Sequence, residues 1–589
     1  VYLDAVFFSR LDSLDFAQEG HRVEFEKPDD SSTPLEFKGV VFNEMKGAMS
    51  SPVSTLWQKL TSYLYPTTTY HYNSGGEPEN IPDLSYEQLI EFYKTHYHPS
   101  NAVFMTYGDI PAYIHQNRIE EKALSCFDKL DLKIGAEDEQ RYNSPVIAED
   151  VYAIDENDMD GKKTHIVISW LLGKSIHLED QIKAHFLSSV LLDNASSPLR
   201  YALETTDLGS APSPLCGVED SNREMCFVCG IEGSVSENSE KLEALVLKTL
   251  NEVAEKGVSQ DQLESVMHQL ELHQREITGD GYPYGLHLVL GGLSAAIHRG
   301  DPVSALNVDP VLEKLREEIK DPEFIKSLVK KLLLDNNHRV RLILKPDTGL
   351  KQLTKEKEEG RVADILKSMT DEEKEKVIVL SEKLAKRQLQ EDDPEVLPKV
   401  GLEDVPPKME IIEGKSDVIQ GFPLTRFEQG TNGLVYQQIV INLPELKNEL
   451  LEVIPYFTTC MTELGCGELD YLETQAWQDR VSGGINAHTT IRSELGNVQN
   501  VDGYFVLSGK ALSRNYESLL QLMEKTLNEI HFDEYPRIRE IIAQQRAGRE
   551  QSVTGNGHML AMMAAASGIS PQAALSHKLR GLSGIKDIK

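Results

Sequence analysis

Hydrophobic residues recur at helical spacing in the segment TPLEFKGVVFNEMKGAMS (33–50), and one carboxylate interrupts them. The residues that fall on one face of such a helix are Phe37, Val40, Val41, Glu44 and Ala48. Thr33 suits the N-cap and Pro34 the first helical position, so the pattern predicts a helix that begins at Thr33. On that helix, Glu44 would point into a buried stripe.

A buried carboxylate needs compensation, because taking a charge out of water is unfavourable by several kcal/mol. Three kinds of partner would serve Glu44: a buried lysine or arginine, a set of backbone N–H donors, or a metal ion. Structural ion pairs are commoner in proteins than metal sites. The residues alone therefore favour an ion pair, or a half-buried glutamate, at this position.

The same order of elements recurs along the chain, which predicts several copies of one unit. A strand pattern at 224–233 precedes two helical segments in TLNEVAEKGVSQDQLESVMHQLELHQRE, which begins at Thr249. A strand pattern at 503–512 likewise precedes TLNEIHFDEYPRIREIIAQQRAGRE, which begins at Thr526. Each copy opens upstream with a strand and a helix, in THIVISWLLG with DQIKAHFLSSVLL and in GLVYQQIVINLP with LLEVIPYFTTCMTEL.

A second repeated pattern consists of a helix, a polar break and an apolar strand. It occurs at residues 86–110 and again at residues 322–347. Together the repeats predict an α+β fold, in which helices cover one face of a mainly antiparallel sheet. Residues 351–400 are rich in Lys and Glu, and Thr370 with Glu373 forms a capping box. This segment predicts a helical-hairpin linker between two halves.

Composition and charge narrow the class of protein. A chain of 589 residues is too long for one core and suggests three or four domains. Its 94 acidic and 60 basic residues give a net charge of −34, which argues against nucleic acid as a partner. The same charge suits cationic peptides, although solubility or a salt-adapted host would also explain it. No long uncharged apolar run predicts a transmembrane helix.

The cysteines do not predict a disulfide framework or a metal site. Six cysteines in 589 residues are sparse and suit a reducing compartment. Cys226 and Cys229 form a CxxC within a strand pattern. Their odd spacing sends the two side chains to opposite faces, so neither redox use nor zinc binding is expected.

The histidine pairs are also interpreted without metal. His268 and His273 in HQLELH are about 140° apart around a helix, so they cannot bind one zinc as an i, i+4 pair does. We interpret them as polar positions on a long amphipathic helix. His96 and His98 lie at a predicted helix end, where the helix dipole favours histidine.

Four stretches carry a family resemblance: FKGVVFNEMKGAM, LYPTTTYHYNSGGEPENIPDLSYEQLIEFYKTHYHPSNAVFMTYGDI, LTRFEQGTNGLVYQQIVINLP and MTELGCGELDY. They closely resemble the presequence proteases, which belong to the pitrilysin/insulysin superfamily of inverted-motif zinc metallopeptidases. The resemblance covers essentially the whole chain. It implies repeated pitrilysin-type α+β domains joined by a helical-hairpin linker. The boundaries expected are 1–145 (partial first domain), 146–350 (second domain), 351–405 (linker) and 406–589 (partial third domain).

The resemblance also implies a metal site. In the family, an H-x-x-E-H helix supplies two zinc ligands and the general base, and a glutamate in an N-E-M-K-G context supplies the third ligand. That position is Glu44 here. No H-x-x-E-H occurs between Val1 and Lys589. Both ends of the chain read as cut, so the motif is expected before Val1, and the family's Arg/Tyr pair is expected after Lys589. No catalytic residue is therefore expected within this chain, which alone should hold no Zn²⁺ and be inactive.

The function implied by the resemblance is that of a zinc metalloendopeptidase. Such an enzyme degrades short unstructured peptides, including basic targeting presequences, inside a closed chamber. A non-catalytic relative that binds peptides or supports a partner remains the alternative, since the H-x-x-E-H is missing. We expect a monomer with no membrane span and no nucleic-acid partner. The expected compartment is the mitochondrial matrix or plastid stroma in a eukaryote, or the cytoplasm in a bacterium.

Overall fold

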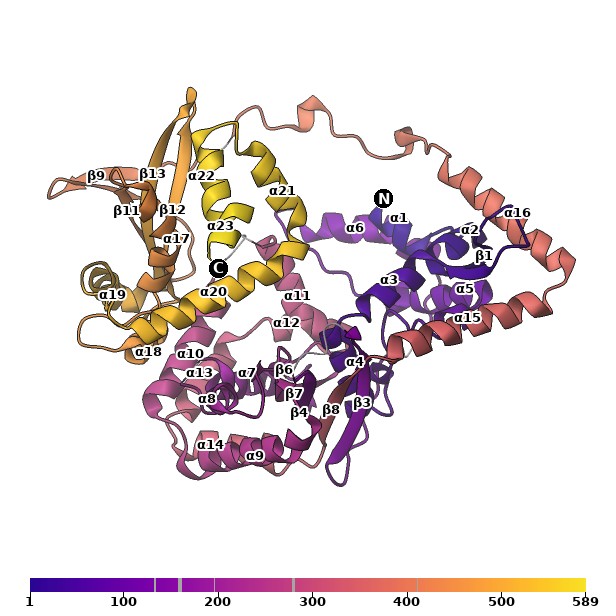
Figure 1. Ribbon diagram of the computed structural model, residues 1–589, viewed down its shortest axis with the longest axis horizontal. Coiled ribbons are helices and arrows are strands. Elements are labelled where there is room, and N and C mark those ends of the chain that lie inside the picture. Colours follow the sequence, from indigo (N-terminus) through magenta and orange to yellow (C-terminus); the bar gives the residue numbers. More distant parts are fainter. Residues whose placement is uncertain (132–133, 157–161, 195, 278–280, 410, 589) are drawn as a thin grey trace. The chain divides into compact units, whose positions relative to one another are not determined.

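The computed structural model describes residues 1–131, 134–156, 162–194, 196–277, 281–409 and 411–588. The chain divides into two compact units (Figure 1). Unit 1 contains residues 1–257, 279–315 and 322–428, and unit 2 contains residues 258–278, 316–321 and 429–589. The domain boundaries expected from the sequence, at 145, 350 and 405, stay a prediction.

The N-terminal part of unit 1 is mainly helical and contains one pair of short strands. β1 (Arg22–Phe25) pairs antiparallel with β2 (Leu35–Lys38). The helices and 3-10 or π turns of this part are α1 (Tyr2–Phe7), α2 (Ser13–Asp15), η1 (Phe16–Gly20), α3 (Val40–Ala48), α4 (Pro52–Leu64), η2 (Thr69–His71), η3 (Ile81–Asp83), α5 (Tyr86–His96), η4 (Pro99–Asn101), α6 (Ala112–Lys122) and η5 (Leu124–Cys126).

The helix predicted to begin at Thr33 is wrong in its first part. Residues 35–38 form β2, and α3 begins only at Val40. The sequence LEFK alternates apolar and polar residues, so Leu35 and Phe37 are buried while Glu36 is exposed. Pairing with β1 supplies the backbone hydrogen bonds that favour the strand over the helix.

The apolar strand predicted after α5 is also wrong. Residues 102–107 form neither a helix nor a strand, and Val103 and Tyr107 are largely exposed. A strand requires a neighbour to pair with its backbone groups. Among the residues that the structure describes, no strand pairs with this segment. In contrast, the corresponding strand at the end of the 322–347 pattern is present as β8.

A six-stranded sheet forms the central layer of unit 1. Its strand order is β3–β8–β4–β7–β5, and β6 also pairs with β7. Only the β3–β8 pair is parallel, so the sheet is mainly antiparallel, as predicted. The strands are β3 (Val146–Ala153), β4 (Thr164–Lys174), β5 (Ala211–Pro212), β6 (Gly217–Glu219), β7 (Glu224–Ser234) and β8 (Arg339–Asp347).

Helices cover both faces of this sheet. Leu56 and Leu60 of α4 pack with Val167 of β4 in one hydrophobic cluster. Because side chains alternate along a strand, the fully buried Ile166 and Ile168 face the opposite side, where α7 and α9 contact β4. The helices that follow β3 in unit 1 are α7 (Leu178–Leu192), α8 (Pro198–Thr205), η7 (Ser236–Asn238), α9 (Ser239–Lys256), α11 (Tyr284–Ile297), α12 (Pro302–Ala305), α14 (Glu323–Val329) and η8 (Lys330–Leu334).

The predicted helical hairpin is confirmed by α15 (Leu350–Ser368) and α16 (Asp371–Gln388). Thr370 and Glu373 form the predicted capping box, in which the Thr370 N–H donates to the Glu373 carboxylate at 2.8 Å. Val362 and Val377 of the hairpin pack with the buried residues of β1 and β2. Beyond the hairpin lie η9 (Pro394–Val396), η10 (Leu402–Asp404), β9 (Lys415–Ile419) and β10 (Phe422–Arg426).

Unit 2 is built on a three-stranded antiparallel sheet of order β11–β13–β12. Leu507 of β13 packs with Leu519 and Leu522 of α19 in its hydrophobic core. Its strands and helices are β11 (Leu434–Asn442), β12 (Ile485–Glu494), β13 (Asn497–Leu512), α10 (Gln260–Arg275), α17 (Asn448–Met461), α18 (Tyr471–Val481), η11 (Ser513–Asn515), α19 (Tyr516–Asn528), α20 (Tyr535–Gly555), α21 (Gly557–Ala566), α22 (Pro571–Arg580) and α23 (Leu582–Asp587). The helix α13 (Asp309–Glu318) begins in unit 1 and ends in unit 2.

The internal repeat is confirmed by the order of the elements. The strand β7 is followed by α9 and α10, and the strand β13 is followed by α19 and α20. The strand–helix openings of the two copies are β4 with α7 and β11 with α17. No helix within the described residues combines the length and the apolar character needed to cross a membrane.

Candidate functional site

Glu44 lies in the middle of α3, and the start of this helix depends on Gly39. The φ angle of Gly39 is 155°, and a Cβ there would lie 2.1 Å from the backbone oxygen of Gly20. Only glycine tolerates this close approach of two backbone segments. From this start, the helix directs Phe42 into the hydrophobic cluster that also contains Phe37.

Glu44 lies on the exposed face of α3, so the prediction that it points into a buried stripe is wrong. Val40 and Val41, which share its face, are 41% and 40% exposed, and Glu44 is exposed as well. The core-facing side of the helix instead carries Phe42, which is 1% exposed, and Met45. Helical spacing grouped the right residues on one face, but that face does not pack on the core of unit 1.

The Glu44 carboxylate makes no hydrogen bond or ion pair with any other residue that the structure describes. Lys46, two residues along α3, pairs instead with Glu358 of α15 at 2.8 Å. The ion pair that the residues alone favoured is therefore not formed within the described part of the chain. Glu44 is an open carboxylate on a face with two exposed valines.

The described residues do not by themselves fit a zinc ion. They contain no group of three or more His, Cys, Asp or Glu side chains arranged to hold a metal. A hydrolytic zinc site takes three protein ligands and leaves one position open for water. Glu44 supplies one carboxylate, so its role as a metal ligand stays a prediction.

The CxxC pair lies on a strand, as predicted. Cys226 and Cys229 are both fully buried in β7, and both are free thiols. Burial raises the pKa of the Cys226 thiol to about 12, and burial also raises the pKa of Cys229 well above its ordinary value. Because the thiolate is the reactive form, these cysteines are unreactive core residues.

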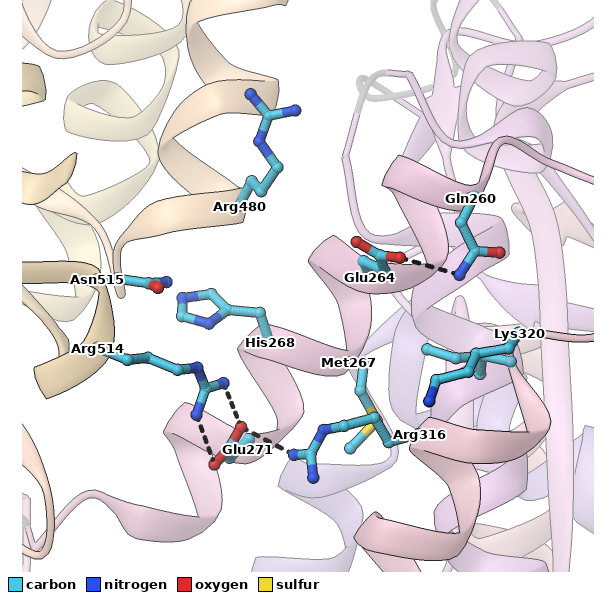
Figure 2. Close-up of a pocket in the computed structure, with 11 residues that line it drawn as sticks. Gln260, Glu264, Met267, His268, Glu271, Arg316, Lys320, Arg480, Arg514 and Asn515 are labelled. Atoms are coloured by element: carbon cyan, nitrogen blue, oxygen red, sulfur yellow. Dashed lines mark hydrogen bonds and ion pairs between the residues drawn. The ribbon is translucent and has the colours of Figure 1, made fainter.

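A second candidate site lies within unit 2, where a cavity has a volume of about 560 Å³ (Figure 2). Side chains from α10, the end of α13 and the segment after it, α18 and η11 surround the cavity. They are Gln260, Glu264, Met267, His268, Glu271, Arg316, Ile319, Lys320, Arg480, Arg514 and Asn515. Four of these side chains are basic and two are carboxylates.

Glu271 is the most heavily engaged carboxylate of this cavity. Its side chain is 4% exposed. Arg514 donates two hydrogen bonds to it, at 3.1 and 2.5 Å, and Arg316 donates a third at 3.0 Å. Arg275, one turn along α10, donates a fourth at 2.9 Å. One buried carboxylate thus joins three guanidinium groups, as the dashed lines in Figure 2 show for two of them.

This arrangement keeps Glu271 ionised. Burial alone raises the pKa of its carboxyl group, but the hydrogen bonds from Arg514 and Arg275 and the charges of Arg514 and Arg316 outweigh burial. The net result lowers the pKa of Glu271 to about 2. Three cations around one anion leave a local excess of positive charge.

His268, one turn before Glu271 on α10, is 6% exposed, and its Nε2 atom has no hydrogen-bond partner among the described residues. Burial, followed by the charge of Arg514, lowers the pKa of His268 to about 4, although Glu271 and a backbone hydrogen bond to Ser482 oppose the shift. The imidazole is therefore neutral at pH 7. The interpretation of His268 as an ordinary polar position of an amphipathic helix is wrong, because the side chain is buried in the cavity wall.

The sequence indicated only a small part of this cavity. Glu271 and Arg275 stand four residues apart, which is the spacing of a helical ion pair. In contrast, Arg514 lies 243 residues away in sequence from Glu271, and no local pattern joins them. Sequence reasoning examined HQLELH for metal binding and missed the carboxylate within it.

Two descriptions of one peptidase family match the chain. "Peptidase M16 inactive domain" matches residues 83–270. The associated domain of subfamily C of the M16 peptidases matches residues 344–589. Together the two matches cover parts of both units, including most of α10.

The chain is similar to named proteases over its whole length. It is 34% identical to the mitochondrial presequence protease of Xenopus tropicalis, with 100% of this chain and 57% of that protein covered. It is 32% identical to presequence protease 1, chloroplastic/mitochondrial, of Arabidopsis thaliana, with 99% and 54% covered. A bacterial relative, protein HypA of Clostridium perfringens, is 26% identical, with 99% and 60% covered. The chain thus spans little more than half the length of these relatives.

Among solved structures, pitrilysin matches 94% of this chain and 54% of its own, at 13% identity and a TM-score of 0.44. The family assignment rests on the sequence matches, which extend from end to end of the chain at up to 34% identity. They agree with the fold expected from the resemblance, which comprises α+β units with mainly antiparallel sheets and a helical hairpin. The chain belongs to the M16 peptidase family, whose members include the presequence proteases.

Proposed function

We propose that this chain is part of a zinc metalloendopeptidase of the presequence protease type. The observation that carries the proposal is the match of 100% of the chain to a presequence protease at 34% identity. The relatives are longer than the region matched, so the activity is proposed for the whole protein and not for residues 1–589 alone. The chain alone is expected to be inactive.

Within this enzyme, we assign Glu44 as one zinc ligand. Its carboxylate is exposed and has no partner among the described residues, so it is free to bind a metal. The exposed Val40 and Val41 beside it provide apolar surface on which another part of the protein can pack. The family's H-x-x-E-H would supply the other two ligands and the general base from outside this chain. When bound, zinc would activate a water molecule and polarise the scissile carbonyl.

The proposed substrates are short unstructured peptides, including basic targeting presequences. The relatives from Xenopus tropicalis and Arabidopsis thaliana are named as presequence proteases. The net charge of −34 favours encounters with cationic peptides over acidic ones. A closed chamber, as the family resemblance implies, would admit an unfolded peptide and exclude a folded domain.

The proposed compartment follows from the same relatives. Those named above are mitochondrial or chloroplastic in eukaryotes, and one is bacterial. We therefore place a eukaryotic protein in the mitochondrial matrix or plastid stroma, and a bacterial one in the cytoplasm. A monomer is proposed as the working form.

The test is a cleavage assay with the protein expressed from its complete reading frame. A quenched fluorescent peptide with several Lys or Arg residues should be cleaved, and a zinc chelator should abolish the cleavage. The Glu44→Gln variant should lose activity by about 100-fold or more, since it removes the charge of a metal ligand. The Glu36→Gln variant, an exposed glutamate on β2, serves as a matched control and should keep full activity.

The same experiment separates the enzyme from the alternative. A complete reading frame without H-x-x-E-H, together with peptide binding but no cleavage, would show a non-catalytic relative. Cleavage that survives both the chelator and Glu44→Gln would show that the zinc peptidase mechanism is wrong for this protein.

A further inference from the structure

The cavity around Glu271 has a charge opposite to that of the chain as a whole. The chain carries a net charge of −34, whereas the cavity is lined by four basic side chains and two carboxylates. The basic side chains are Arg316, Lys320, Arg480 and Arg514 (Figure 2). A cationic recess on a strongly acidic chain retains anions selectively, because the surrounding surface repels them.

Glu271 does not use up the hydrogen-bonding capacity of the arginines around it. A guanidinium group has five N–H donors in a planar fork. The bonds to Glu271 use two donors of Arg514 and one of Arg316. Glu271 instead fixes the orientation of the two guanidinium groups, which leaves further N–H donors beside the cavity.

Arg480 and Lys320 are held less tightly and face more solvent. Arg480 pairs with Asp261 at 3.5 Å, and its side chain is 51% exposed. Lys320 pairs with Glu317 at 2.7 Å, and its side chain is 61% exposed. Exposed ion pairs of this kind contribute little to stability, so either cation can turn to an incoming anion at small cost.

His268 provides an independent indication of a ligand. Its side chain is only 6% exposed in the wall of the cavity, yet Nε2 has no hydrogen-bond partner among the described residues. A buried polar atom without a partner is unfavourable and calls for a specific explanation. In the tautomer with its proton on Nε2, the ring donates a hydrogen bond to an oxygen in the cavity.

We propose that this cavity is a binding site for an oxyanion group, either a carboxylate or a phosphate. The oxygens of the ligand are bound by Arg480, Arg514 and Lys320, and His268 Nε2 donates a hydrogen bond to one of them. The volume of about 560 Å³ exceeds that of a bare ion and suits a small molecule or the end of a peptide. The buried Met267 and Ile319 provide apolar contact for the remainder of that ligand.

This site is separate from Glu44 and does not depend on the proposed peptidase function. All residues that line it belong to unit 2, whereas Glu44 belongs to unit 1. Binding is measurable on the purified 589-residue chain without any catalytic activity. Failure of the anion site and failure of the zinc peptidase proposal would therefore be recognised in different experiments.

Isothermal titration calorimetry at pH 7 and low salt tests the site with two sources of oxyanion. One arm uses inorganic phosphate and pyrophosphate, and the other uses an acetylated tetrapeptide with a free C-terminal carboxylate beside its C-terminal amide. Binding of the phosphates alone would identify a phosphate site. Binding of the free-acid peptide but not of the amide would identify a peptide-carboxylate site. Either result supports the proposal, and affinity should fall as salt rises.

Variants show whether the bound anion occupies this cavity. Arg480→Gln and Lys320→Gln should each weaken binding by about three- to tenfold, because each removes one charge-assisted hydrogen bond. His268→Leu should weaken it as well, with the unfolding temperature recorded to verify folding. Arg492→Gln, which removes a charge from β12 of unit 2 outside the cavity, should leave binding unchanged.

Two results would overturn the proposal. One is the absence of binding for all of these probes at millimolar concentration. The other is binding that Arg480→Gln and Lys320→Gln weaken no more than Arg492→Gln does, which would show only nonspecific attraction to surface charge.

Discussion

Arg514 and Glu271, which lie 243 residues apart in sequence, meet through two parallel hydrogen bonds of 3.1 and 2.5 Å. Bidentate pairs between an arginine and a carboxylate are among the strongest polar contacts in proteins. The same carboxylate accepts hydrogen bonds from Arg275 of α10 and Arg316 of α13. Glu271 therefore joins three separate segments of unit 2 through one buried group.

Replacement of Glu271 by Gln should destabilise unit 2. The amide keeps the shape of the side chain but removes the negative charge, which leaves three arginines close together without an anion. Because the arginine side chains are 36% to 56% exposed, solvent screens part of this repulsion. We expect a loss of about 2 kcal/mol in the free energy of unfolding. Urea denaturation, with hydrogen exchange at the amides of α10, measures the change.

Glu264→Gln is the matched control on the same helix. Glu264 is exposed and accepts a hydrogen bond from Gln260 four residues before it. This variant should change the free energy of unfolding by less than about 0.5 kcal/mol. Equal effects of the two substitutions would contradict the central position of Glu271.

The stability of unit 2 should fall when His268 becomes protonated. The pKa of His268 is about 4 in the folded chain against an ordinary value of 6.5, so the unfolded chain binds this proton first. The contribution of His268 is therefore complete above pH 6.5 and is lost progressively as the pH falls to 4. A shift of this size corresponds to about 2–3 kcal/mol. Urea midpoints measured at intervals between pH 7 and pH 4 follow the loss.

Other carboxylates titrate near pH 4, so the comparison with His268→Gln isolates this one group. The variant lacks the titrating imidazole and should show a shallower loss of stability between pH 6.5 and pH 4. Parallel pH profiles for the two proteins would show that His268 does not titrate with a lowered pKa.

The start of α3 should not tolerate any residue but glycine at position 39. In Gly39→Ala, the new Cβ would lie 2.1 Å from the backbone oxygen of Gly20, so the two backbone segments must separate. We expect a loss of at least about 2 kcal/mol in the free energy of unfolding of unit 1. Gly47→Ala in the same helix has nothing within 4 Å of its Cβ and should stabilise by about 0.5–1 kcal/mol. Thermal unfolding of both variants distinguishes a local clash from a general effect of the extra methyl group.

Hydrophobic periodicity was sufficient to predict the regular elements of the sheets. The strands β4 and β7 are continuous buried runs, and α9 and α10 follow them with a clear apolar stripe. The capping box at Thr370 and Glu373 located the second helix of the hairpin to the residue. These signals are local, so a single sequence contains them.

The errors arose where the structure depends on distant contacts. The segment LEFK forms β2 because β1 pairs with it, although Thr33 and Pro34 are typical of a helix start. The face of α3 that carries Glu44 is exposed because the core contacts Phe42 instead, which helical spacing alone cannot decide. The cation cluster at Glu271 depends on residues up to 243 positions apart, so only the fold brings it together.

The most direct test of the central claim is the zinc content of the whole protein with and without the Glu44 carboxylate. The protein expressed from its complete reading frame should retain about one zinc per chain after dialysis, as expected for a three-ligand site. Glu44→Gln should weaken zinc binding by at least about tenfold, while Glu36→Gln should retain the metal. Equal zinc content in Glu44→Gln and the wild-type protein would contradict the assignment of Glu44 as a metal ligand.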